Sequence, residues 1–260
     1  MGWSFLGCMD VGVGQIVMKI VATIEARMSS SRLPGKVLMP VLEQPMLQHL
    51  VRRLRAVPSI DAIILATTTN PADNVLEAFA GKVGIDCFRG SEDDVMQRVI
   101  DAAGTAGADL VVEITGDCPI IDPEIVEQVI RMFKAHDVAY VSNTQMRSYP
   151  DGMDVQVFRL DTLKRSAALT SERLDREHVT MHIRSHPELF SQVHLVAPSE
   201  VHWPELGLTL DEQADYELLK RIIEHFKEQP LFSCLDVVRL LRGRPEWLAI
   251  NQAVQRRGNT

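Results

Sequence analysis

Short apolar runs alternate with longer amphipathic segments along the first 142 residues of the chain. Such runs are typical of buried strands, whereas apolar positions three or four residues apart are typical of helices packed on one face. The expected strands cover residues 18–24, 61–66, 85–88, 109–114 and 138–142, and the expected helices cover 44–57, 72–82, 92–103 and 123–135. This alternation predicts an α/β fold with a mostly parallel sheet flanked by helices.

Residues 143–205 break this rhythm and are expected to form an inserted lobe or an extension of the sheet. They contain an expected strand at 154–158, a helix at 159–169 and a strand near 192–196. After them we expect a core strand at 206–210, a helix at 212–228 and two short helices within 232–257. No linker-like segment divides the chain, so residues 18–260 are predicted to form one domain with an insertion at about 143–205.

The first 17 residues lack a basic start, and Asp10 and several glycines interrupt their apolar positions. They make a poor signal peptide and are predicted to be a disordered extension. No stretch of about 20 residues is apolar enough to cross a bilayer. The four cysteines lie far apart without metal-binding spacing. We therefore expect free thiols, a cytoplasmic location and no membrane partner.

The net charge of −8 argues against nucleic acid as a partner, because proteins that bind it usually carry a basic face. A small anionic ligand stays possible, since a few well-placed cations can outweigh the mean charge. Three cations and three serines occur together directly after the first expected strand, in the segment EARMSSSRLPGK (25–36). Such a loop suits a polyphosphate, although the alternative is a solvated basic loop. The segment is neither a Walker A loop nor a GxGxxG loop.

Two aspartates follow expected strands, Asp117 in ITGDCP and Asp211 in LTLDEQAD. In open α/β sheets ligands bind beyond the carboxyl ends of the strands, and hard carboxylate oxygens suit Mg²⁺. The alternative for each is a role in a turn or as a helix cap. Asp122 is better read as the cap of the helix that starts at Pro123, and Asp215 as a structural residue of a first helical turn.

At this point the motifs carry a resemblance that extends over about residues 18–250. The loop R-x-x-S-x-R-L-P-G-K (27–36) is similar to the signature loop of the CMP-sugar-acid synthetases, which are cytidylyltransferases acting on Kdo and on sialic-acid-like sugars. The fuller pattern most resembles the spore-coat-polysaccharide branch. Its further blocks occur in order: ATTTNPADN, FRGSEDDVMQR, ITGDCPIIDPE, YPDGMDVQVF, DREHVT and LTLDEQADYELLK.

The resemblance implies a Rossmann-like nucleotidyltransferase fold, often dimeric through the insertion, that transfers CMP from CTP to a small acidic acceptor and releases pyrophosphate. It implies Mg²⁺ between Asp117 and Asp211, and catalytic roles for Arg27, Arg32, Lys36 and Asp117. The implied nucleotide contacts are Ala26, Arg27, Ser30, Ser31, Arg32, Lys36, Thr67, Asp73, Arg89 and Gly116. The implied acceptor contacts are Asp154, Glu177 and His178.

Three positions depart from the pattern of that branch. Glu113, Gln156 and Gly207 stand where Arg, Glu and Arg are expected. These departures bear on the identity of the acceptor and leave the nucleotide half intact. Two alternatives stay open: a sugar-1-phosphate nucleotidylyltransferase, which would carry a longer glycine-rich loop that is absent here, and a non-catalytic nucleotide-binding protein on the same fold.

Overall fold

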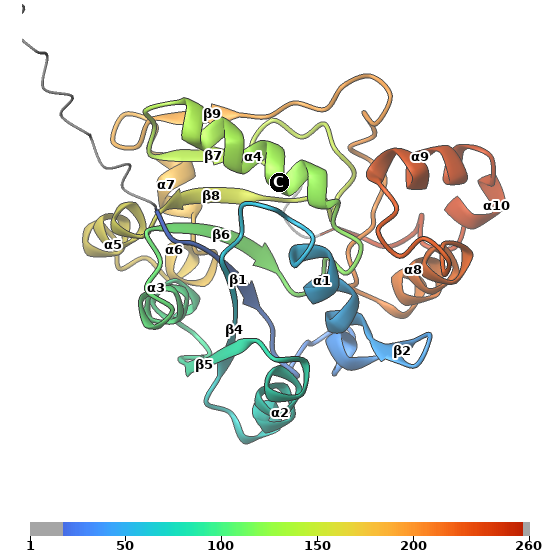
Figure 1. Ribbon diagram of the computed structural model, residues 1–260, viewed down its shortest axis with the longest axis horizontal. Coiled ribbons are helices and arrows are strands. Elements are labelled where there is room, and N and C mark those ends of the chain that lie inside the picture. Colours follow the sequence, from blue (N-terminus) through green and yellow to red (C-terminus); the bar gives the residue numbers. More distant parts are fainter. Residues whose placement is uncertain (1–17, 257–260) are drawn as a thin grey trace, which may run out of the picture.

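The computed structural model describes residues 18–256, so the extension predicted for residues 1–17 lies outside the described part of the chain. A seven-stranded sheet in the order β5-β4-β1-β6-β8-β7-β9 forms its centre (Figure 1). These strands are β1 (Ile20–Glu25), β4 (Ala62–Thr68), β5 (Asp86–Gly90), β6 (Leu110–Thr115), β7 (Tyr140–Ser142), β8 (Gln156–Arg159) and β9 (Gln192–His194); β2 (Pro40–Val41) and β3 (Gln44–Pro45) form a separate small hairpin. The α/β fold predicted from the sequence is confirmed.

Helices cover both faces of this sheet, because most of its strands carry apolar side chains on both sides. One face packs against α1 (Met46–Leu54), α2 (Asn74–Val83), α4 (Pro123–Ala135), α8 (Gln213–His225) and α9 (Cys234–Arg242). The other face packs against α3 (Val95–Thr105), α5 (Leu160–Leu169) and α7 (Met181–Ser185), with α6 (Arg173–Glu177) beside α3 and α10 (Pro245–Leu248) beside α9. Figure 1 shows these two layers on opposite sides of the strands. Short 3-10 turns, η1 (Lys36–Leu38) and η2 (Pro71–Asp73), complete the fold.

Helix α4 shows how local sequence sets an element's start. The Asp122 carboxylate accepts a hydrogen bond from the Glu124 N–H at 2.9 Å, and Pro123 occupies the first helical position. An aspartate cap satisfies an N–H group that has no partner within the helix, and proline there sacrifices no hydrogen bond. The second oxygen of Asp122 accepts from the Cys234 N–H at 2.7 Å, so the same side chain also fixes the start of α9.

The segment 143–205 contributes to the main sheet. Strand β8 pairs antiparallel with β6 and with β7, and β9 pairs parallel with β7. The strand expected at 154–158 begins only at Gln156, so Asp154 does not open a strand as predicted. The reason is the Asn143 side chain, whose Oδ1 accepts the Val155 N–H at 2.8 Å and whose Nδ2 donates to the Met153 carbonyl. These bonds replace ladder pairing just before β8.

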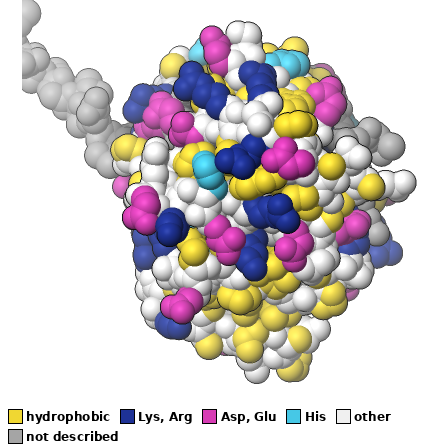
Figure 2. Space-filling model, turned by 90° about the vertical axis from the view of Figure 1, so that its right-hand side faces the viewer, with side chains coloured by type: hydrophobic (Ala, Val, Ile, Leu, Met, Phe, Trp, Pro, Cys, Tyr) yellow, Lys and Arg dark blue, Asp and Glu magenta, His cyan; other side chains and the backbone are white. Residues whose placement is uncertain are grey.

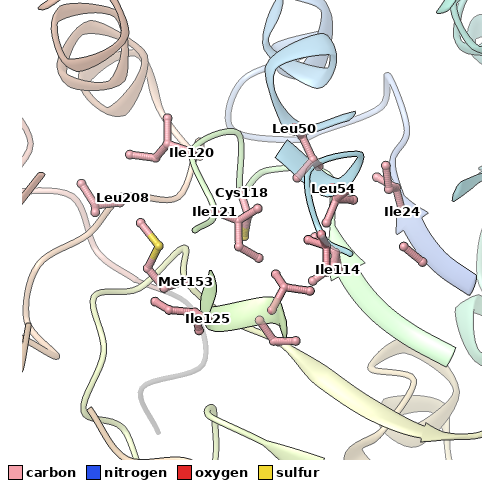
Figure 3. Packing of buried hydrophobic residues seen from close by; sticks show 14 of the residues in the cluster. Ile24, Leu50, Leu54, Ile114, Cys118, Ile120, Ile121, Ile125, Met153 and Leu208 are labelled. Atoms are coloured by element: carbon pink, nitrogen blue, oxygen red, sulfur yellow. The ribbon is translucent and has the colours of Figure 1, made fainter. Parts of the chain in front are cut away.

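The strand predicted at 206–210 is wrong. Leu206, Leu208 and Leu210 are buried as expected, but the segment is paired with other loops instead of with a sheet strand. The Leu208 N–H donates to the Asp151 carbonyl at 2.7 Å and the Leu210 N–H to the Asp117 carbonyl at 2.8 Å. In Figure 3, Leu208 lies with Ile120 and Met153 on one side of Cys118. The segment therefore fills the core beyond the end of β6.

Within the described range 18–256, no helix is long and apolar enough to cross a membrane. Cys87, Cys118 and Cys234 are free thiols, and burial raises the pKa of the Cys118 thiol well above its ordinary value. On the side of the molecule that carries α8, α9 and α10, basic and acidic side chains are intermingled (Figure 2). That face therefore presents no broad area of one charge sign.

Candidate active site

A cavity of about 330 Å³ opens beyond the carboxyl ends of β1 and β6. Parallel neighbouring strands end at the same edge of the sheet, so the loops that follow β1 and β6 meet there. The lining includes most of the residues predicted for the site: Ala26, Arg27, Ser30, Ser31, Arg32, Lys36, Gly116, Asp117, Glu177, His178 and Asp211. Segments that lie far apart in the sequence therefore converge on one hollow.

Lys36 is the centre of the charged part of this cavity. Its Nζ lies 3.0 Å from an oxygen of Asp117 and 3.0 Å from an oxygen of Asp211. Burial alone would lower the pKa of Lys36, but the two carboxylates raise it above its ordinary value. Lys36 is therefore held as a cation, and the two predicted metal carboxylates are close enough to share one positive ion.

Three cations from two segments of the chain lie close to Asp211. Arg32 Nη2 lies 2.7 Å from its Oδ1, and Arg256 Nη1 lies 3.8 Å from its Oδ2. Burial acts to raise the pKa of Asp211, but Lys36, Arg32 and Arg256 hold it below its ordinary value. Asp211 was predicted to end a strand; instead the hydrogen bond from Leu210 to the backbone of Asp117 sets its place.

The loop after β1 is fixed by local geometry. Gly35 has a φ of 71°, and its N–H donates to the Met28 carbonyl at 3.0 Å, which closes the turn before Lys36. A positive φ of this kind suits glycine because other residues carry a Cβ that is strained there. Asp73 fixes the start of the same loop. Its Oδ1 accepts the Met28 N–H at 2.7 Å, and its Oδ2 accepts hydrogen bonds from Thr68.

Gly116 allows the loops after β1 and β6 to approach each other. Its N–H donates to the Glu25 carbonyl at 2.9 Å. A Cβ at this position would lie 2.8 Å from that carbonyl oxygen and 2.9 Å from the Cβ of Ala26. Any larger residue would push the Ala26 backbone away from Asp117, so glycine is required by the close packing of the two loops.

Arg27 and the predicted acceptor residues lie at more exposed parts of the cavity. Arg27 Nη1 lies 3.3 Å from Glu92, whose carboxylate also accepts a hydrogen bond from the Ser29 hydroxyl at 2.6 Å. Glu177 ends α6, and His178 follows it; both are exposed toward the cavity. These side chains are accessible to a ligand.

Thr67, Asp73, Arg89 and Asp154 do not line this cavity, and their assigned roles stay predictions. Arg89 lies within β5, where its guanidinium donates to the Thr68 carbonyl at 2.9 Å and to the Asn70 carbonyl at 2.8 Å. Thr67 is fully buried. Burial and the negative charge of Asp151 raise the pKa of Asp154 to about 7. In this structure Asp73 and Arg89 brace the neighbouring loops.

Two acidic side chains that were not predicted as site residues lie on the neighbouring strands beneath the cavity. Glu25 ends β1 and lines the cavity, and Glu113 lies on the neighbouring strand β6, where its charge acts on Glu25. Burial raises the pKa of Glu113 to about 7, and burial together with the charge of Glu113 raises the pKa of Glu25 well above its ordinary value. Both carboxyls therefore keep a proton to a higher pH than an ordinary glutamate does.

The orientation of Gln156 shows why Glu113 is tolerated there. The Gln156 Oε1 accepts from the Tyr140 hydroxyl at 2.5 Å and from the Thr180 hydroxyl at 2.5 Å. Its amide nitrogen therefore points at Glu113 and donates to that carboxylate, which is its register partner across β6 and β8. Two of the three departures from the expected pattern are thus hydrogen-bonded to each other.

A family model described as cytidylyltransferase matches residues 21–233. The chain belongs to the cytidylyltransferase family. This cytidylyltransferase is 33% identical over 233 residues to the spore coat polysaccharide biosynthesis protein SpsF of Bacillus subtilis, covering 87% of this chain and 95% of that protein. It is 38% identical over 122 residues to the 8-amino-3,8-dideoxy-manno-octulosonate cytidylyltransferase of Shewanella amazonensis, covering 46% of this chain and 49% of that one.

A solved cytidylyltransferase from Leptospira borgpetersenii superposes with a TM-score of 0.85 at 32% identity, covering 92% of this chain and 100% of that one. The nucleotidyltransferase fold inferred from the motifs is thereby confirmed, and so is the class of enzyme, a CTP-dependent nucleotidyltransferase.

The carboxylates of this cytidylyltransferase suit a magnesium ion that is also held by phosphate. Within residues 18–256 no group of three or more histidine, cysteine or acidic side chains has the spacing of a metal cage. Asp117 and Asp211 nevertheless converge on Lys36 at 3.0 Å each. Mg²⁺ is commonly bound by one or two carboxylates together with waters and substrate phosphates, which is the donor set that these two residues offer.

Arg98 is a further cavity residue that sequence reasoning missed. It lies on α3 and is only 3% exposed, because its guanidinium reaches back to the carbonyls of Ser91 and Glu92. The signal that could have found it was its position in the matched block FRGSEDDVMQR, where a charged residue interrupts the buried face of the helix. Burial lowers the pKa of Arg98, and the charge of Glu25 opposes that effect.

Proposed function

We propose that this cytidylyltransferase transfers CMP from CTP to a small acidic acceptor, a sialic-acid-like or deoxy-sugar acid, and releases pyrophosphate with the help of Mg²⁺. The observation that carries the proposal is the placement of Lys36 at 3.0 Å from both Asp117 and Asp211, inside a cavity rimmed by Arg27 and Arg32. Cations that face carboxylates in one hollow match what a metal-bound triphosphate requires.

In the proposed reaction an acceptor oxygen attacks the α-phosphorus in line. The bond from the α-phosphorus to the bridging oxygen breaks, pyrophosphate leaves, and the acceptor's hydroxyl proton is released. Arg27, Arg32 and Lys36 would hold the triphosphate and neutralise its charge. When bound, Mg²⁺ between Asp117 and Asp211 would supply Lewis-acid stabilisation of the phosphate oxygens. Positioning and charge neutralisation account for most of the catalysis of such reactions.

The acceptor is assigned to the part of the cavity that Glu177 and His178 line. The names of two relatives support a sugar-acid product, since one acts in spore coat polysaccharide biosynthesis and the other on an amino-deoxy-octulosonate. The imidazole of His178 can donate a hydrogen bond to an acceptor carboxylate or hydroxyl.

A homodimer formed through the insertion belongs to the same proposal. Several of the large hydrophobic side chains that are exposed in the described chain lie within residues 143–205, namely Met146, Leu169, Leu174, Leu189 and Val196. Large apolar side chains that are exposed to solvent are common at interfaces between subunits. Sedimentation of the wild type and of Leu174→Glu would test this, because only the wild type should sediment as a dimer.

A pyrophosphate-release screen tests the proposed reaction. CTP, UTP, GTP and dTTP would each be offered with Mg²⁺ and a panel of sugar acids and neutral sugars. We expect release with CTP and a sugar acid only, and loss of release by at least about 100-fold in Lys36→Ala and Asp117→Ala, since each removes a charge that faces the triphosphate. Thermal unfolding would show that both variants stay folded. Release with UTP or dTTP on a sugar 1-phosphate would contradict the proposal.

A further inference from the structure

The last described residues of the chain return to the candidate active site. Arg256 is 11% exposed, and its Nη2 lies 2.7 Å from the Oδ1 of Asp215, a carboxylate with no exposed surface. The same guanidinium donates to the Thr209 hydroxyl at 3.0 Å and lies 3.8 Å from Asp211. The C-terminal segment, residues 251–256, thereby places a largely buried cation close to one of the two carboxylates proposed to hold Mg²⁺.

Gly207 makes room for this arginine. A Cβ at residue 207 would lie 2.1 Å from Nη2 of Arg256 and 2.3 Å from its Cζ, so a side chain at 207 and the guanidinium of Arg256 cannot occupy the same volume. Gly207 is also the third departure noted in the sequence. Arg256 can therefore take this position only because residue 207 has no side chain.

Asp215 connects Arg256 to Asp211. Its Oδ2 accepts the backbone N–H of Asp211 at 3.1 Å and that of Glu212 at 2.9 Å, while its Oδ1 accepts from Asn251 at 2.9 Å and from Arg256. Among residues 18–256, Arg256 is the cation recorded in a salt bridge with Asp215. A buried carboxylate without a cation is costly, so loss of Arg256 would drive the Asp215 side chain to shift, and the Asp211 backbone is hydrogen-bonded to that side chain.

The C-terminal segment also reaches the predicted phosphate loop. Arg32 Nη1 donates to the backbone carbonyl of Gln255 at 3.2 Å, while Arg32 Nη2 lies 2.7 Å from Asp211. The segment thus holds one residue proposed for the triphosphate and one proposed for the metal. The contact between Gln255 and Arg32 and the contact between Arg256 and Asp215 each join residues that are more than 40 positions apart in the sequence.

We propose that Arg256 is a positioning residue for nucleotide and metal binding, which the C-terminal segment supplies in the volume left by Gly207. The inference rests on the proposed function, because it assumes that Asp211 and Arg32 bind CTP and Mg²⁺. Arg256 acts through Asp215 and Asp211 and is not itself assigned a contact with substrate. Outer residues that orient metal ligands typically contribute about 10- to 100-fold in affinity or activity.

The test compares Arg256→Ala with Arg239→Ala, which removes an exposed arginine from α9. Calorimetry with CTP and Mg²⁺, without acceptor, would give the binding constant of each protein, and thermal unfolding would give its stability. We expect CTP–Mg²⁺ affinity to fall by about 10-fold or more in Arg256→Ala and to stay unchanged in Arg239→Ala. Affinity within twofold of the wild type, with or without a lower melting temperature, would overturn the inference.

A rescue variant separates positioning from a general loss of stability. In Gly207→Arg/Arg256→Ala the guanidinium is carried by residue 207, in the volume that Arg256 vacates. We expect this double variant to recover a large part of the CTP–Mg²⁺ affinity, whereas no recovery would contradict the shared-volume argument. The proposed function fails separately: wild type that binds no CTP with Mg²⁺, or releases no pyrophosphate with any acceptor, would refute that function.

Discussion

Replacing Glu113 by glutamine tests the role of the buried acid pair, Glu25 and Glu113, that lies beneath the cavity. The glutamine has nearly the same shape, so its carbonyl oxygen can accept the hydrogen bond from the Gln156 amide. The change removes one ionisable group from a site where burial raises the pKa of Glu113 to about 7. The expected effect is therefore one of charge and pH, with little change in packing.

The sign and size follow from that pKa. An unfolded chain releases the glutamate proton near its ordinary value of 4.5, whereas the folded protein keeps the proton until about pH 7. Between these values the folded state binds more protons, so the stability of the wild type falls as the pH rises through this window. A difference of roughly 2.5 pKa units at 1.36 kcal/mol per unit corresponds to about 3 kcal/mol, fully lost above pH 7.

Urea unfolding at pH 5 and at pH 8 measures this effect. At pH 5 the wild type and Glu113→Gln should be of similar stability, since the carboxyl is still largely protonated. At pH 8 the variant should be more stable by about 3 kcal/mol, because it has no charge to bury. Glu228→Gln, which changes the same charge at an exposed position, should show no such difference. Parallel pH curves for the wild type and Glu113→Gln would refute the buried acid pair.

Three further predictions concern the loops around the cavity. Gly116→Ala should destabilise the protein by about 1–3 kcal/mol in urea unfolding and weaken CTP binding, because the added Cβ would lie 2.8 Å from the Glu25 carbonyl oxygen. The control Gly104→Ala, where the added Cβ meets open space, should have neither effect. Asp73→Ala should cost about 1–3 kcal/mol and weaken CTP binding in calorimetry, since the Met28 and Thr68 donors lose their acceptor. Glu92→Gln should leave the free energy of unfolding within about 1 kcal/mol, because its ion pair with Arg27 is largely exposed. A CTP affinity unchanged by Gly116→Ala and Asp73→Ala would show that these loops do not shape the nucleotide site.

The order and type of most elements could be predicted because they depend on local pattern. Helix α4 runs over the predicted residues 123–135, since Asp122 and Pro123 mark its start and apolar spacing marks its buried face. The alternating leucines of segment 206–210 both identified it as a core segment and led to its wrong assignment as a strand. Its alternating leucines show burial, but burial does not reveal whether the backbone pairs with a strand or with the loops at Asp151 and Asp117.

Site residues could be predicted from the sequence only where a single segment contains the pattern that identifies them. The cations of the loop after β1 and the aspartates Asp117 and Asp211, which follow expected strands, were found from their residue types and order. The proximity of Glu25 to Glu113 was missed because it depends on the register between β1 and β6, in which Glu25 is the partner of Thr115. Arg256 was missed because nothing local links the end of the chain to Gly207; only the folded backbone brings the two together.

The central claim is that this cytidylyltransferase uses CTP and Mg²⁺ at the cavity around Lys36. Calorimetric titration of CTP with Mg²⁺ into the wild type and into Lys36→Ala tests it most directly, since both carboxylates proposed for the metal lie 3.0 Å from that amine. The account predicts that the wild type binds CTP in a magnesium-dependent way and that Lys36→Ala loses most of this binding while staying folded. Equal CTP affinity in the two proteins, or a CTP affinity of the wild type that does not depend on magnesium, would contradict it.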